Sequence, residues 1–307
     1  MPTEGPVLPT PHLAKLSALL RNPRLPQADK PRVEEAETRY NRWIAELQAI
    51  QHGDPDTVDR LVAATNSYKR FIELDLIFDS QADFLYRQKG QLKLDNTILE
   101  EFLPQLVYRS LRGIDETYEL GPKNTFASLT FSSSVGNPGH GGRPSVRTKD
   151  QDFILGKTLY LKTSFDRGFE EADLVESHLG YVCAECKTNL DKTMFQEAVA
   201  TSRDLKMAVP SSLYFLVCEF LDMTPVSIIP TQIDDVLIVR KARRLPANVR
   251  QEFRDANARR THRQTYIEYL DSCQFCPDVF KRMVGKIQAL IDNTAPDADS
   301  VLARGHF

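Results

Sequence analysis

Three residues in the middle of the chain have the types and spacing of a hydrolytic site: Asp173, Glu185 and Lys187. The stretches 173–180 and 181–187 are predicted to be two short strands, joined by a polar turn that ends in Gly180. Side chains two apart in a strand point to one side, so Glu185 and Lys187 project together. The hairpin would place Asp173 beside them. Two carboxylates and an ammonium can hold Mg²⁺ and direct a water at a phosphodiester, which predicts a metal-dependent nuclease.

Other side chains compete for the role of the first acid. Asp166 is the strongest alternative to Asp173, and three further acids lie nearby: Asp152, Glu170 and Glu171. A purely structural alternative for Glu185 and Lys187 is an exposed ion pair on an edge strand.

Two flanking helices carry further candidates. Glu100 and Glu101, on a helix predicted from about Asn96 to Arg112, could add a carboxylate through a water or could form a solvated helix face. Gln196, one turn into the helix that Asp191 is predicted to cap, could support the metal site, touch a phosphate or be a plain exposed glutamine.

The surrounding elements suggest an α/β core between helical regions. Residues 1–95 have helical periodicity, residues 96–245 are predicted to follow the order helix, three strands, helix, strand, and residues 246–307 are helical again. The predicted strands before the hairpin are 129–135 and 153–161. After the second helix, the nearly continuous apolar run 213–220 is typical of a strand buried on both faces. We therefore predict an N-terminal helical domain, a nuclease core and a C-terminal helical region.

Composition limits where a DNA surface could lie. The formal net charge of −3 and the 26% content of charged residues give no overall signature of a nucleic-acid binder, so any such surface must be local. Two segments are basic: the Gly/Pro/Ser-rich loop 132–149, without an acid, and residues 239–264, with nine basic residues against two acids. The candidates for DNA contacts are Gln196 and the arginines of these segments, namely Arg143, Arg147, Arg243, Arg244, Arg259, Arg260 and Arg263. The alternative for residues 239–264 is a solvated helix face, and the alternative for residues 132–149 is a mobile connector.

Cysteine usage and hydropathy suggest a cytoplasmic protein. The five cysteines are an odd number, which argues against a disulfide scaffold. Cys183 and Cys186 have Cys-x-x-Cys spacing, but on a strand they face opposite sides and cannot share one zinc ion. No apolar run approaches the length of a membrane span, and the N-terminus lacks the pattern of a secretory signal.

Asp173 and the sequence Glu185-Cys-Lys187, within the order helix, three strands, helix and strand, resemble the PD-(D/E)xK nuclease superfamily. The sequence from Tyr181 to Asp191, followed by Phe195-Gln-Glu-Ala198, is similar to type II restriction endonucleases of the Bpu/BbvCI kind, in which two different subunits cut a short asymmetric DNA site. The resemblance is specific from about Lys149 to Val239. One departure is Ala172 in place of the proline before Asp173, which leaves the choice of aspartate open.

The resemblance implies a mechanism and a partner. Asp173, Glu185 and the backbone carbonyl of Cys186 would bind Mg²⁺, and Lys187 would orient the attacking water, leaving a 5′-phosphate and a 3′-hydroxyl. Double-stranded DNA would be the substrate, and a second, non-identical subunit would complete the enzyme, with a homodimer as the alternative. A repair or recombination nuclease and a catalytically inert DNA-binding module are the competing functions.

Overall fold

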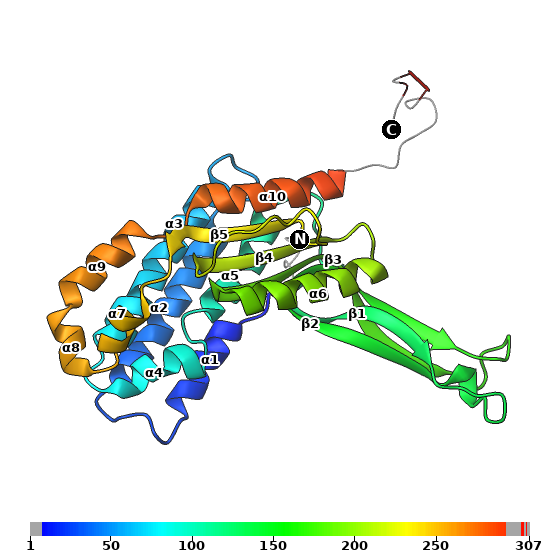
Figure 1. Ribbon diagram of the computed structural model, residues 1–307, viewed down its shortest axis with the longest axis horizontal. Helices are drawn as coiled ribbons and strands as arrows, with labels where there is room; N and C mark the ends of the chain where they lie inside the picture. Colours follow the sequence, from blue (N-terminus) through cyan, green and yellow to red (C-terminus); the bar gives the residue numbers. More distant parts are fainter. Residues whose placement is uncertain (1–7, 293–301, 304, 306–307) are drawn as a thin grey trace.

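The computed structural model describes residues 8–292 together with 302, 303 and 305. Its elements are α1 (Pro11–Leu20), α2 (Lys30–Ala49), α3 (Thr57–Arg70), the π-helical turn η1 (Phe71–Phe78), α4 (Asp83–Gln91), α5 (Thr97–Ser110), β1 (Glu119–Phe131), η2 (His140–Gly142), β2 (Pro144–Thr163), β3 (Asp173–Leu190), α6 (Lys192–Ala208), β4 (Leu213–Leu221), β5 (Asp235–Arg243), α7 (Ala247–Glu252), α8 (Ala256–Thr261), α9 (Arg263–Ser272) and α10 (Pro277–Asp292). Figure 1 shows the helices gathered around one end of a sheet, from which a long arm projects. Among the described residues, no helix is long and apolar enough to cross a membrane.

The sheet is mixed and has the order β1-β2-β3-β4-β5. β1, β2 and β3 are antiparallel neighbours, whereas β3, β4 and β5 run parallel. Helix α5 precedes the three antiparallel strands, α6 follows them, and β4 comes next. The predicted α/β order of helix, three strands, helix and strand is therefore confirmed. β3 lies in the interior of the sheet, so its polar side chains do not belong to an edge strand.

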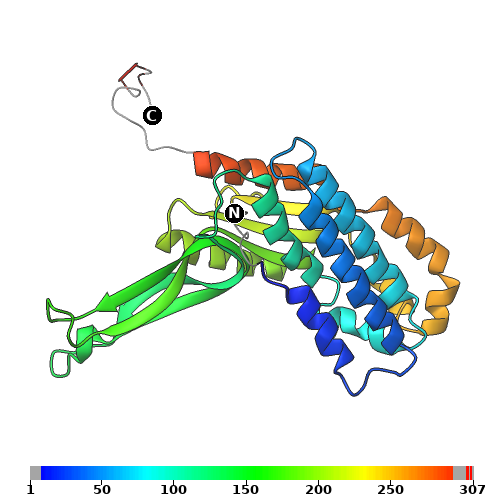
Figure 2. The same ribbon diagram turned by 180° about the vertical axis from the view of Figure 1, so that it is seen from behind.

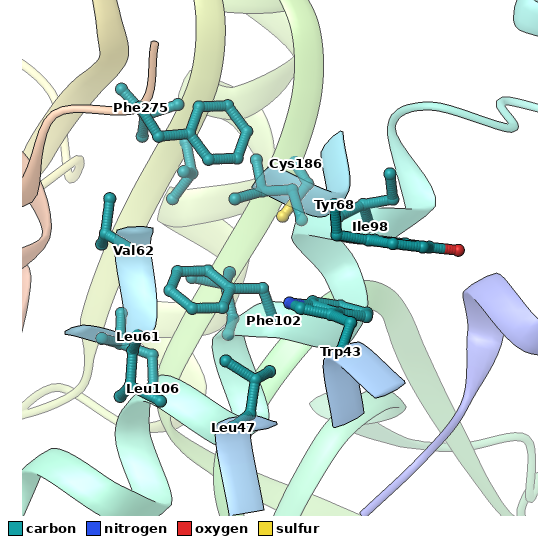
Figure 3. Close-up of a cluster of buried hydrophobic side chains, with 14 of the residues drawn as sticks. Trp43, Leu47, Leu61, Val62, Tyr68, Ile98, Phe102, Leu106, Cys186 and Phe275 are labelled. Carbon is teal, nitrogen blue, oxygen red and sulfur yellow. The ribbon is translucent and has the colours of Figure 1, made fainter. Parts of the chain in front are cut away.

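Two buried clusters cover the two faces of the sheet. On one face, Phe153, Val182, Ala184 and Cys186 pack against α1, α2, α3, α5 and α10. Figure 3 shows Cys186 in this cluster, close to Phe102 and Phe275. On the other face, Cys183 and neighbouring strand residues pack against α6. Cys183 and Cys186 therefore lie on opposite faces, and the predicted alternation of this strand is correct.

Local sequence signals account for the helix that covers the second face. The side chain of Asp191 accepts a hydrogen bond from the backbone N–H of Met194 at 2.9 Å, which caps α6 as predicted. The run in β4 is buried from Tyr214 to Phe220, as its continuous apolar pattern indicates.

The predicted hairpin between residues 173 and 187 is wrong. Residues 173–190 form one continuous strand, and the turn lies instead at 164–172, between β2 and β3. Gly180 occupies a β-bulge: Leu155 pairs with Val182, whereas Gly156 pairs with Gly180, which leaves Tyr181 as the extra residue. A Cβ atom on Gly180 would clash with the side chains of Cys183 and Thr125, so close packing explains this glycine.

The arm consists of β1, β2 and the first half of β3 (Figures 1 and 2). Near its base, Thr125 of β1 also pairs with His178 of β3, so the three strands curl together there. The basic segment 132–149 closes the β1–β2 hairpin and begins β2. Backbone hydrogen bonds from Ser132 and Ser133 to Arg143 and Gly142 hold its two sides together.

Candidate active site

Glu185 and Lys187 form an ion pair on the α6 side of β3. Their Oε1 and Nζ atoms are 2.6 Å apart, and the side chains are 20% and 22% exposed, so solvent or a substrate can reach both. The hydroxyl of Tyr214, on β4, donates a hydrogen bond to the other Glu185 oxygen at 2.9 Å. Burial opposes the charge on Lys187, but the hydrogen bond and charge of Glu185 outweigh it and raise the pKa of Lys187. The lysine is therefore a stable cation beside the carboxylate.

Asp152 brings a second carboxylate to this point from β2. The pairing of Phe153 with Ala184, continued by one residue, places Asp152 opposite Glu185, on the same side of the sheet. The backbone N–H of Cys186 donates to Asp152 Oδ2 at 2.8 Å, which fixes the carboxylate beside the Glu-Cys-Lys sequence. Burial is the largest influence on Asp152 and, together with the charge of Glu185, raises its pKa against the opposing effects of the Cys186 N–H, Lys93 and Lys187.

Glu100, on α5, is a third acid close enough to Asp152 for their charges to interact. Its side chain is buried, and burial together with the charge of Asp152 raises its pKa to about 7. Lys93, which precedes α5, partly offsets this effect on both acids. Lys93 has a left-handed backbone conformation with φ of 52°, which is uncommon for a residue other than glycine and is found often at functional sites.

The structure does not bring Asp173 or Asp166 to this site. Asp173 begins β3 and pairs with Thr163. It precedes Glu185 by twelve residues on one extended strand, a separation of roughly 40 Å. Its backbone is described, but its side chain lies outside the described part. Asp166 folds back on its own loop, where it accepts backbone hydrogen bonds from Gly168 and Glu170. The prediction that a hairpin holds Asp173 beside Glu185 is therefore wrong.

The oxygen donors at the site suit a hard cation such as Mg²⁺. Asp152 and Glu185 provide carboxylates on adjacent strands, and Mg²⁺ usually takes one or two protein carboxylates together with water and substrate oxygens. Burial, and to a smaller extent the charge of a neighbouring acid, raises the pKa values of Asp152 and Glu100, and a bound cation would favour their charged forms. Within the described residues, no three His, Cys, Asp or Glu side chains form a complete metal cage. The thiol of Cys186 is buried in the core, so only its backbone carbonyl could take part.

Sequence analysis named Asp152 and Glu100 only as secondary candidates and missed Lys93 and Tyr214. A signal for Asp152 was available in the Asp-Arg-Gly sequence at 166–168, which is typical of a turn. The observed hairpin is centred on residue 168, and the β-bulge at Tyr181 then shifts the pairing by one residue, which places Asp152 opposite Glu185. No local pattern marks Lys93 or Tyr214, because folding brings them close from separate elements.

The predicted DNA contacts are spread over four parts of the structure. Arg143 and Arg147 lie on the arm, where Arg147 forms an ion pair with Asp204 of α6 at 3.0 Å. Gln196 is exposed on α6. Arg243 is the last residue of β5, and Arg244, which follows it, pairs with Asp222 at 3.1 Å.

The remaining predicted contacts lie on α8 and α9. Arg260 is exposed there, and Arg263 binds both oxygens of the Asp79 carboxylate.

Arg259 has a structural position that does not suit a phosphate contact. It is 1% exposed, and its guanidinium donates to the backbone carbonyls of Phe78, Ser80, Ala82, Phe253 and Arg254. The Arg259 guanidinium also forms an ion pair with Asp83 at 3.1 Å. The expectation that Arg259 contacts DNA is therefore corrected: it ties α8 to the segment between η1 and α4.

Comparisons with known proteins place this fold and sequence among restriction enzymes. The family model described as Bpu10I restriction endonuclease matches residues 91–307. A solved structure described as the native BbvCI A2B2 tetramer at low resolution is similar in fold, with a TM-score of 0.62 and 18% sequence identity. The match covers 94% of this chain and 100% of that chain. No curated protein sequence matches.

Proposed function

Because this chain belongs to the Bpu10I restriction endonuclease family, we propose that it is one subunit of a type II enzyme that hydrolyses DNA phosphodiesters at a short specific site. One observation carries the proposal. Asp152, Glu185 and Lys187 converge at neighbouring positions of β2 and β3, with the Cys186 N–H holding the Asp152 carboxylate. Two carboxylates and an ammonium on adjacent strands can bind a metal ion and direct a water at a phosphate, which suits phosphodiester hydrolysis.

In this proposal Asp152 and Glu185 hold Mg²⁺, with the Cys186 carbonyl as a further ligand and Glu100 as a nearby acid. The bound ion would neutralise charge on the scissile phosphate and lower the pKa of a water. Lys187 keeps its positive charge through Glu185 and can orient that water or stabilise the charge that develops on the phosphate. Tyr214 fixes the Glu185 carboxylate by its hydrogen bond. Hydrolysis in this manner leaves a 5′-phosphate and a 3′-hydroxyl.

Affinity for DNA would come from side chains outside this cluster. The exposed Arg143, Arg147, Arg243 and Arg260, with Gln196, Arg244 and Arg263, are the candidate contacts. They lie on the arm, on α6 and along the C-terminal helices, so that phosphate contacts would be distributed along the duplex.

A second, non-identical subunit is part of the proposal. One cluster of this kind hydrolyses one strand, so a double-strand break needs two of them. The protein of similar fold is described as an A2B2 tetramer, which contains two kinds of chain.

Digestion of plasmid DNA tests the function. The chain is incubated with Mg²⁺, alone and together with the product of a neighbouring nuclease-like gene, and the ends are sequenced. Defined fragments that require both chains and Mg²⁺ are expected. Cleavage only at junctions, flaps or other structured DNA would replace the proposal with a repair function, and binding without any cleavage would leave a DNA-binding module.

A further inference from the structure

A cleft of about 680 Å³ adjoins the candidate active site at the end of β3. Thr188 and Asn189, which directly follow Lys187, form part of its wall. The remainder comes from η1, α4, β4, α7 and α9 and from the connecting residues 93, 244–245 and 253–254. Lys93 also lines the cleft, and its charge reaches Asp152 and Glu100. Asn189 lies about 7 Å along the strand from Lys187, so that a ligand in the cleft would be a near neighbour of a phosphate at the catalytic lysine.

The lining of the cleft is strongly basic. Five cationic side chains face it, whereas its acid, Glu73, is neutralised by Arg240 at 2.8 Å and by Lys69 at 3.4 Å. Lys89 pairs with Asp95 and Arg244 pairs with Asp222. The other three cations are Lys93, Arg250 and Arg254, and no acid of the described chain forms an ion pair with any of them.

The arginines of the cleft are close enough to repel one another. Burial, then the charge of Arg244 and to a smaller extent that of Arg254, lower the pKa of Arg250 against the opposing effects of Asp222 and Tyr86. Its Nε donates to the backbone carbonyl of Leu245 at 3.0 Å, which directs the guanidinium without neutralising it. Bringing like charges together in this way is unfavourable for the protein alone. An anion bound between the arginines would attract each of them and offset their mutual repulsion.

Aromatic rings form another part of the same lining. Phe220 and Tyr269 stack with their ring centroids 5.9 Å apart and their planes at 19°. Tyr269 also stacks on Tyr266 with centroids 6.3 Å apart, and Tyr86 of α4 lines the same cleft. Flat aromatic surfaces bind nucleobases by stacking, whatever the base, whereas guanidinium groups bind phosphate oxygens. A ligand that carries both a phosphate and a base fits both parts of the lining.

We propose that this cleft binds a nucleoside phosphate, and that in the working enzyme this is one nucleotide of the substrate DNA, turned out of the double helix beside the scissile bond. The last step rests on the proposed function. Arg250 and Arg254 hold its phosphate, the ring of Tyr269 supports its base, and Lys93 lies between the nucleotide and the metal-binding acids. A concave site of this size suits a single nucleotide better than a duplex backbone, which needs an open surface.

Direct binding tests the cleft without any need for cleavage. Calorimetric titration of the purified chain compares deoxynucleoside 5′-monophosphates with inorganic phosphate. Monophosphates are expected to bind more tightly than phosphate, and Arg250→Ala/Arg254→Ala is expected to weaken them by about tenfold or more. Tyr269→Leu should remove the advantage of nucleotide over phosphate. The charge-matched control Arg42→Ala/Arg60→Ala changes two exposed arginines on α2 and α3 and should bind as the wild type does.

Mismatched DNA identifies the source of the nucleotide. Turning a nucleotide out of the helix costs least when it is already unpaired. Duplexes with a single mismatch at successive positions of the mapped site are therefore titrated without divalent metal, using the chain with its partner subunit. One position near the cut is expected to bind more tightly when mismatched, and this gain should disappear in Arg250→Ala/Arg254→Ala.

Three results would overturn the inference in separate ways. Nucleotide binding that is equal in the wild type and the cleft variants would remove the site. Binding of phosphate alone, without preference for nucleotides, would reduce it to an anion site. Binding of free nucleotides with no response to any mismatch would remove the link to substrate DNA.

Two controls keep these results interpretable. Thermal unfolding checks that each variant is folded, and the exposed Arg254→Glu is the substitute if the double variant is not. Plasmid cleavage by the wild type, measured in parallel, separates failure of this inference from failure of the proposed function.

Discussion

At the scale of single residues, Lys187 is expected to act on the reaction and not on affinity. Its ammonium lies 2.6 Å from Glu185, and the candidates for phosphate contacts are arginines of other elements. Lys187→Ala should lower the rate of cleavage about a hundredfold or more while leaving DNA binding within a few-fold of the wild type. Single-turnover cleavage and gel-shift titration measure the two quantities. Near-normal cleavage by this variant would remove the lysine from the site.

The choice of the first acid is a second prediction at this scale. Asp152→Asn keeps a hydrogen-bond acceptor for the Cys186 N–H but removes the negative charge that a metal ion needs. It should abolish cleavage at all Mg²⁺ concentrations, with folding intact by thermal unfolding. The matched controls Asp166→Asn and Asp173→Asn should cleave normally. Loss of cleavage in either control, with activity kept by Asp152→Asn, would contradict the assignment.

At the scale of elements, Arg259 and Arg260 are neighbours in α8 with opposite roles. Arg259 is buried and holds carbonyls on both sides of the η1–α4 turn, so Arg259→Ala should lower the free energy of unfolding by about 3 kcal/mol or more. Arg260→Ala should leave stability unchanged and, if the side chain contacts a phosphate, should reduce the slope of log K against log salt by about one unit. Urea unfolding and salt-dependent DNA titration make the comparison. Equal stability of the two variants would contradict the structural role of Arg259.

The packing of α1 against α3 and α5 makes stability depend on pH through His12. Its ring nitrogens lie 3.0 Å from Thr97 Oγ1 and 2.9 Å from Tyr68 Oη, and burial, followed by the charge of Lys69, lowers its pKa to about 3. The unfolded chain binds a proton near pH 6.5, where the folded chain does not. The contribution of the neutral His12 ring to the free energy of unfolding is therefore fully present above pH 6.5, and it is lost as the pH falls from 6.5 towards 3.

The expected loss is about 1 kcal/mol per pH unit in that range. His12→Gln, which cannot take up the proton, should flatten the dependence of unfolding free energy on pH between 6.5 and 4. His140→Gln, on the arm and 64% exposed, should keep the wild-type profile. An unchanged slope in His12→Gln would show that other groups cause the acid sensitivity.

Local patterns predicted those elements whose residues are positioned by their immediate neighbours. The Asp191 cap and the apolar run of β4 identified α6 and a buried strand because capping and two-sided burial are local signals.

The middle of β3 was misassigned as a turn because Ser177 and His178 are polar. His178 is accommodated where β1 crosses, because it pairs with Thr125 and its Nδ1 lies 3.1 Å from the Asn124 carbonyl. That crossing is a non-local contact. The wrong turn carried Asp173 into the site in place of Asp152.

At the scale of the whole molecule, β3 connects three regions. Its first half belongs to the projecting arm (Figure 1), its second half carries Glu185 and Lys187, and its residues Thr188 and Asn189 line the basic cleft. Strand pairing fixes the distance between these regions along one rigid element. If DNA binds as proposed, a duplex that reaches Lys187 would therefore meet the arm on one side and the cleft on the other.

The last prediction concerns assembly. This chain brings one Asp152–Glu185–Lys187 cluster, so it should hydrolyse one strand of a site, and a different subunit with a cluster of its own should hydrolyse the other. A complex of the wild-type chain with a partner inactivated in its own metal-binding acid should nick a single, defined strand of a supercoiled plasmid. The reciprocal complex, with Lys187→Ala in this chain and an intact partner, should nick the opposite strand, as sequencing of the nicks would reveal. This chain alone should bind poorly or nick one strand, whereas clean double-strand breaks by it alone in a palindromic sequence would establish a homodimer instead.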